Sequence, residues 1–119
     1  MSDSLLHKKC VPCEGGTEPL KKEEEDLYFE QTPDWTVLRE GSHQLVREFE
    51  FKNFREVLDV VAKIGEIAES EGHHPNLYMH DWKKLKVELT THAIGGLSIN
   101  DFILAVKIDE MVKKGSVEF

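Results

Sequence analysis

Histidine residues concentrate in one short part of this chain. Four of the six histidines, His73, His74, His80 and His92, fall within twenty residues. The unperturbed pKa of histidine is about 6.5, so an imidazole can both donate and accept a proton near neutral pH. Several imidazoles in one place predict proton-transfer chemistry, and the alternative that such a cluster raises is a metal site.

The adjacent pair His73-His74 is poorly arranged for binding one metal ion. Consecutive residues of an extended segment point in opposite directions, whereas histidines that share a metal often stand four residues apart on a helix. A site that combines one of the pair with His92 and a carboxylate stays open, but we expect no metal. A structural role is also open, because cationic side chains stabilise the C-terminal end of a preceding helix.

Length and charge restrict the class of protein. The chain has 119 residues and a formal net charge of −8, which fits one domain with a single hydrophobic core. Nucleic-acid binding requires clustered lysine and arginine, so we expect no nucleic-acid partner. No apolar run approaches the roughly 20 residues that span a bilayer, and residues 1–9 lack the apolar core of a signal peptide. We therefore predict a soluble cytoplasmic protein without a membrane partner.

The chain divides into an N-terminal arm (1–18), a folded domain (19–115) and a short tail (116–119). The arm contains Cys10 and Cys13 in a single Cys-x-x-Cys motif. A structural zinc site usually needs four ligands, and a thioredoxin-like motif needs a strand before it and a helix after it. Neither condition is met, so we expect an arm without a functional dithiol or metal, although those roles stay open.

Capping residues and hydrophobic periodicity predict seven elements. Asn53, with Glu56 three residues later, is typical of a capping box, and Gly72 stands where a helix C-terminus favours a left-handed residue. Apolar residues that alternate with polar ones from Leu85 predict a half-buried strand. The other predicted elements are a first helix ending near Gln31, a hairpin of strands at 35–39 and 44–51, a short strand or loop at 77–79, and a last helix from Ser98 to about Lys113.

This order, α-β-β-α-β-β-α, predicts an α+β fold. The expected architecture is a single domain in which helices pack on one face of a four-stranded antiparallel sheet. The last helix is apolar on more than one face, and such a helix must be buried on two sides. Its apolar residues are Phe102, Ile103, Leu104, Ala105, Val106, Ile108, Met111 and Val112. In so short a chain, this favours a homodimer or homotetramer formed through the last helix.

The residues around the histidines resemble the signature of a known family, the pterin-4a-carbinolamine dehydratases. The likeness extends from about Leu20 to Val112. The segments and residues that carry it are ESEGHHP (69–75), Trp82, VELTTH (87–92), GGLS (95–98) and Asp101. The segment between His74 and His92 is one residue longer than in animal members of the family. This difference affects which family residue Trp82 corresponds to, but it does not affect the match of the histidines.

The resemblance implies a hydro-lyase that needs no cofactor or metal, with a pterin as its substrate. Such an enzyme removes water from 4a-hydroxytetrahydrobiopterin or a related 4a-hydroxytetrahydropterin and yields the quinonoid dihydropterin. The reaction recycles the pterin cofactor of aromatic amino-acid hydroxylases. An acid must protonate the departing hydroxyl and a base must take the proton from N5, which imidazoles near neutral pH suit well.

The resemblance also implies which residues form the site. His73, His74 and His92 are the expected catalytic set: His73 as main base, His74 positioning the pterin and sharing proton transfer, and His92 as the facing acid. The expected pocket lining adds Gly72, Thr90, Thr91 and Ala93.

Three further residues have expected supporting roles. Asp101 should cap the last helix and orient nearby groups, and Trp82 should pack under the site. Trp35 should either border the pocket or belong to the core. The rival hypothesis from another class is a non-catalytic protein-binding or dimerisation module on the same fold. The intact histidine triple favours the enzyme, and a metal-dependent hydrolase is the third choice.

Overall fold

The computed structural model describes residues 4–11 and 18–115, and the predicted order of elements is confirmed within them. Cys13 and the tail 116–119 lie outside the described residues. Segment 77–79, which the sequence left open, belongs to a strand. The elements are η1 (Leu5–His7), α1 (Lys22–Phe29), β1 (Thr36–Leu38), β2 (Gln44–Glu50), α2 (Phe54–Glu71), β3 (Asn76–His80), β4 (Lys84–Leu89), η2 (His92–Ile94) and α3 (Ile99–Gly115), where η denotes a short 3-10 helix.

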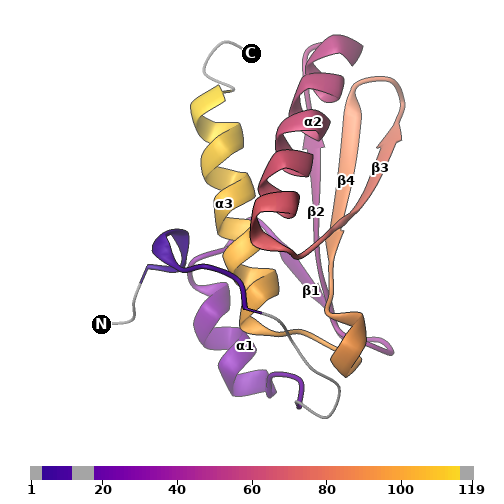
Figure 1. Cartoon of the computed structure of the whole chain (residues 1–119). Coiled ribbons are helices and arrows are strands. Elements are labelled where there is room, and N and C mark those ends of the chain that lie inside the picture. The colour runs from indigo at the N-terminus through magenta and orange to yellow at the C-terminus, as the bar shows by residue number, and fades with distance from the viewer. Residues whose placement is uncertain (1–3, 12–17, 116–119) are drawn as a thin grey trace.

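The four strands form one antiparallel sheet in the order β1-β2-β4-β3. Leu45 pairs with Leu89 and Phe49 pairs with Leu85 across the two central strands, and all four side chains are buried. Because side chains alternate along a strand, these residues share one face of the sheet. Figure 1 shows the three α-helices on one side of the sheet, as predicted.

Most of the apolar residues of α3 are buried within a single chain. Helix α3 contacts helices α1 and α2, the short helix η1 and strand β2. The predicted burial of α3 on two sides is therefore produced by elements of the same chain (Figure 1). The buried apolar residues of α3 are thus no evidence for an oligomer, and a homodimer or homotetramer stays a prediction. The buried members are Phe102, Ile103, Leu104, Ala105 and Ile108.

The N-terminal arm contributes to the same hydrophobic core. Leu5 and Cys10 are buried among the core residues of the domain. Burial, together with the nearby Glu71 carboxylate, raises the pKa of the Cys10 thiol to about 12. Only the thiolate is a good nucleophile or metal ligand, so this buried thiol is inert near neutral pH. This favours the expectation of an arm without redox or metal chemistry at Cys10.

No helix within the described residues is both long enough and apolar enough to cross a membrane.

Candidate active site

His73 follows directly on the end of α2. The helix ends at Gly72, which has φ +69° and whose N–H donates to the carbonyl of Ala68 at 2.8 Å. The N–H of His73 donates to the same carbonyl at 3.2 Å. A left-handed residue at this position costs least when it is glycine. The predicted helix end is therefore confirmed, and it fixes the backbone from which His73 projects.

A buried carboxylate from the start of α3 holds the His73 ring. Asp101 is fully buried, and its Oδ1 lies 2.6 Å from Nε2 of His73, whose side chain is 12% exposed. The other oxygen of Asp101 accepts hydrogen bonds from the N–H of Ser98 at 2.9 Å and the hydroxyl of Thr91 at 2.8 Å. Asp101 thus caps the last helix and orients a neighbouring group, as the sequence predicted.

This network assigns the proton on the His73 ring. Oδ2 of Asp101 accepts from Thr91 and Ser98, and when Oδ1 accepts in the same way, Nε2 of His73 carries the hydrogen. The lone pair is then on Nδ1, which is free to take a proton. A carboxylate that holds one ring nitrogen fixes the tautomer and stabilises the imidazolium that forms when the other is protonated.

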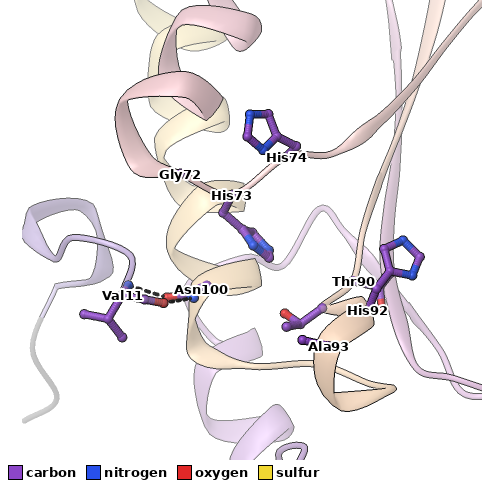
Figure 2. A pocket seen from close by; sticks show the side chains of 9 residues that line it. Val11, Gly72, His73, His74, Thr90, His92, Ala93 and Asn100 are labelled. Atoms are coloured by element: carbon purple, nitrogen blue, oxygen red, sulfur yellow. Dashed lines mark hydrogen bonds between the residues drawn. The ribbon is translucent and has the colours of Figure 1, made fainter. Parts of the chain in front are cut away.

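His74 and His92 lie at the same site but are far more exposed. The His74 side chain is 60% exposed, and its Nε2 lies 2.7 Å from Oε2 of Glu69 on α2. His92 is exposed at the start of η2. Figure 2 shows the ring of His73 pointing toward the segment of Thr90 and Ala93, while the rings of His74 and His92 project in other directions. The three imidazoles border one space from different sides.

A cavity of about 410 Å³ brings the predicted residues together. That volume is in the range of small-molecule binding sites. Two lining residues, Val11 and Asn100, were not predicted from the sequence. Asn100 is adjacent in sequence to the predicted Asp101, whereas no local sequence pattern marks Val11 as a site residue. The lining comprises all seven predicted residues, Gly72, His73, His74, Thr90, Thr91, His92 and Ala93, together with those two (Figure 2).

The expectation for Trp82 is wrong. This residue lies on the tight turn between β3 and β4, has φ +53° and is 60% exposed. The turn stands at the opposite end of the hairpin from His74 and His92, so Trp82 does not pack under the site. The motif places Trp82 near the histidines in sequence only, because the two strands carry it away from them.

Trp35 is a core aromatic, which was one of the two expectations for it. It is buried, its indole N–H donates to the carboxylate of Asp109 on α3 at 2.9 Å, and it does not line the cavity. Burial raises the pKa of Asp109, although the Trp35 N–H and the guanidinium of Arg47 favour the ionised form. Trp35 therefore joins β1 to α3.

Metal-ligand geometry is not found within residues 4–11 and 18–115. No three histidine, cysteine or carboxylate side chains there are grouped so that they could hold one ion. A metal-free site stays a prediction.

The fold and the cavity define a small α+β protein whose candidate active site pairs a histidine with a buried carboxylate. The family model described as "Pterin 4 alpha carbinolamine dehydratase" matches residues 18–111. The chain therefore belongs to the pterin-4-alpha-carbinolamine dehydratase family, and it is an enzyme of the hydro-lyase class.

The sequences of individual relatives align with this chain over most of their length. A protein of Alkaliphilus metalliredigens is 46% identical over 109 residues, which are 91% of this chain and 96% of the relative. One of Rickettsia canadensis is 48% identical over 109 residues, covering 91% and 97%. Both are named for pterin-4-alpha-carbinolamine dehydratase. The crystal structure of a transcriptional coactivator/pterin dehydratase from Brucella melitensis has a TM-score of 0.73 at 23% identity, covers 79% of this chain and 98% of that one, and shows a likeness of fold alone.

Proposed function

We propose that this protein dehydrates a 4a-hydroxytetrahydropterin by histidine general acid–base catalysis. The reaction breaks the C4a–O bond and the N5–H bond, forms a C4a=N5 double bond, and releases the quinonoid dihydropterin and water. Membership of the family supports the substrate class. The observation that carries the catalytic proposal is the 2.6 Å contact between His73 and the fully buried Asp101 at the wall of the cavity.

His73 is the base in this proposal. Asp101 holds the hydrogen on Nε2, so Nδ1 accepts the proton that leaves N5 of the substrate. The charge that then develops on the ring is stabilised by the adjacent carboxylate. General acid–base catalysis typically accelerates a reaction by about 10²–10⁴-fold, which is the contribution expected from His73 and its acidic partner together.

His92 is the acid, and His74 positions the substrate. His92 borders the cavity on a different side from His73 (Figure 2), which suits the protonation of a hydroxyl that departs from C4a while N5 is deprotonated. His74 is held by Glu69 at the rim. From there its other ring nitrogen, Nδ1, can accept a hydrogen bond from the pterin and share in proton transfer, and no cofactor or metal enters the reaction.

Threonine hydroxyls and backbone groups complete the proposed pterin site. The Thr90 hydroxyl donates to the carbonyl of His43 at 2.9 Å, and the Thr91 hydroxyl donates to Asp101. Because both protons are used within the protein, these oxygens keep only acceptor capacity toward the cavity. They would accept hydrogen bonds from N–H groups of the pterin, and Gly72 and Ala93 would add backbone contacts.

The proposed setting is cofactor recycling. The product would be reduced and returned to aromatic amino-acid hydroxylases, in the cytoplasm, with the protein acting as a homodimer or homotetramer.

The test of this function follows the decay of enzymatically generated 4a-hydroxytetrahydrobiopterin in the ultraviolet, with and without the protein. We expect the protein to accelerate the decay and a strong chelator to leave the acceleration unchanged. Loss of activity with the chelator would favour a metal-dependent enzyme. No acceleration by a folded protein would favour the rival hypothesis of a non-catalytic binding module.

A further inference from the structure

The N-terminal arm bridges the two elements that carry the His73–Asp101 pair. The ammonium of Lys9 donates to the carbonyl of Ser70 at 2.9 Å, and the N–H of Cys10 donates to Oε1 of Glu71 at 2.8 Å, both in the last turn of α2. Burial alone would raise the pKa of Glu71, but the Cys10 N–H and the Lys107 ammonium outweigh it and lower that pKa. Glu71 is therefore a charged anchor for the arm.

The next residue of the arm is fixed to the first turn of α3. Asn100 is buried, and its Oδ1 accepts from the N–H of Val11 at 3.0 Å while its Nδ2 donates to the carbonyl of Val11 at 2.5 Å. A side-chain amide that pairs with both backbone groups of one residue fixes the orientation of that residue. Figure 2 shows these two bonds at the side of the cavity opposite His92.

The side chain of Val11 is exposed although its backbone is held firmly. It is 60% exposed and lines the same cavity as the three histidines. An apolar side chain held at the edge of a cavity gains free energy when a ligand covers it. The other described lining residues offer imidazoles, hydroxyls, an amide, backbone groups and the single methyl groups of alanine and threonine, so Val11 supplies the largest aliphatic side chain of the cavity wall.

We propose that Val11 is a substrate-contacting residue of the dehydratase, and that Asn100 is the positioning residue that holds it. This inference rests on the proposed function: the substrate is a flat heterocycle, and Val11 would cover the part of it that lies away from His92. The arm is then a wall of the active site rather than an extension beside it.

A contact remote from the reacting atoms affects the substrate and the transition state equally. Loss of such uniform binding raises KM and leaves kcat unchanged. Val11→Ala removes two methyl groups, so KM should rise by about three- to ten-fold. The same rise is expected in the dissociation constant of 7,8-dihydrobiopterin, which lacks the 4a-hydroxyl and cannot be dehydrated.

The experiment measures KM, kcat and calorimetric 7,8-dihydrobiopterin binding for the wild type, Val11→Ala and the control Leu58→Ala. Leu58 is an exposed apolar residue of α2 that does not line the cavity. We expect the rise in KM and in the dissociation constant for Val11→Ala alone, with thermal unfolding unchanged. Equal values in all three proteins would overturn the inference while leaving the proposed function intact. A wild type that neither binds the dihydropterin nor dehydrates the substrate would overturn both.

Asn100→Leu, alone and combined with Val11→Ala, tests the positioning role. The leucine keeps the approximate volume of the side chain and removes both hydrogen bonds to Val11. If Asn100 acts through Val11, the double variant should raise KM no further than Asn100→Leu alone, with kcat unchanged, whereas independent effects would multiply. Multiplied effects, or a fall in kcat with KM unchanged, would contradict the positioning role.

Discussion

The three histidines of the site differ in what holds them. His73 is largely buried and is bound by the fully buried Asp101, whereas His74 is exposed and contacts the exposed Glu69. A ring that is fixed in one tautomer is better prepared for a defined proton transfer than one that can rotate in solvent. At the scale of single residues, the His73–Asp101 pair is therefore the centre of the proposed chemistry.

Asp101→Asn should lower kcat by about 10²-fold or more. The amide cannot accept from His73, Thr91 and Ser98 at once, so either the tautomer of His73 reverses or a buried donor loses its acceptor. The measurement is kcat over a range of pH, together with thermal unfolding.

The matched control for this variant is Asp109→Asn. Asp109 also binds two side chains, the buried Trp35 and the partly buried Arg47, but does not line the cavity. It should lose stability and keep its activity. Equal kcat values for the two variants would contradict the role given to Asp101.

The thiol of Cys10 should resist alkylation in the folded protein. Its pKa is raised from 9.0 to about 12, so near pH 8 the folded chain should hold roughly 10³-fold less thiolate than the unfolded chain. The neutral thiol is favoured by folding, and the stability that it contributes is present below pH 9 and is lost as the pH rises toward 12. Iodoacetamide labelling of Cys13→Ser protein, with and without urea, checks this. Equal labelling rates in the two states would contradict it.

Most of the candidate site could be predicted from the sequence because its residues come in two short segments. Residues 72–74 and 90–93 each lie at the end of an element with a clear local pattern, and the resemblance to the family supplied the pairing of these segments. Val11 was not predictable in this way. Its contact with Asn100 joins residues 89 positions apart, and no local sequence pattern predicts such a contact.

At the scale of elements, the two ends of α2 show how a local signal positions the site. Asn53 accepts a hydrogen bond from the N–H of Glu56 at 2.9 Å at one end, and Gly72 turns the chain at the other. These signals depend on a few neighbouring residues, so they were readable in the sequence. The position of Trp82 was not, because it depends on the length of the β3–β4 hairpin and the backbone of its turn.

Gly65 inside α2 and Gly72 at its C-terminal cap should respond to alanine in opposite directions. Gly65 lies inside the helix with open space where a Cβ would be, whereas Gly72 has φ +69°. Gly65→Ala should raise the free energy of unfolding by up to about 1 kcal/mol, and Gly72→Ala should lower it by about 1 kcal/mol. Gly72→Ala should also lower kcat, because it displaces the backbone of His73.

Urea unfolding and the dehydratase assay on both variants provide the measurement. A Gly72→Ala protein with full stability and full activity would show that the left-handed helix end does not set the position of His73.

At the scale of the whole molecule, one chain buries most of the apolar residues of its last helix. Helix α3 is covered by the arm, α1, α2 and the sheet. The predicted burial of the last helix is therefore correct, but it is caused by the same chain and not by a second one. A pattern of apolar residues shows how much of a helix is covered but not which part of the chain, or which second chain, covers it.

The oligomer remains a separate prediction with its own measurement. Sedimentation equilibrium should give a mass of two or four times the chain mass of 13.7 kDa. Ile99, Val106, Met111 and Val112 are apolar residues of α3 that are only partly buried, so Met111→Lys should weaken the association. A mass of 13.7 kDa at all concentrations would contradict the oligomer and leave the active site of one chain unaffected.

The central claim is that His73 performs the proton transfer in a pterin dehydratase. The most direct test compares the rate of 4a-hydroxytetrahydrobiopterin decay with the wild type, His73→Ala and the control His80→Ala. His80 lies on β3 outside the cavity, paired with Asp81 and Glu48 at the surface. We expect kcat to fall by about 10²–10⁴-fold for His73→Ala, with a smaller change in pterin binding, and to stay unchanged for His80→Ala. An unchanged kcat in folded His73→Ala would contradict the claim.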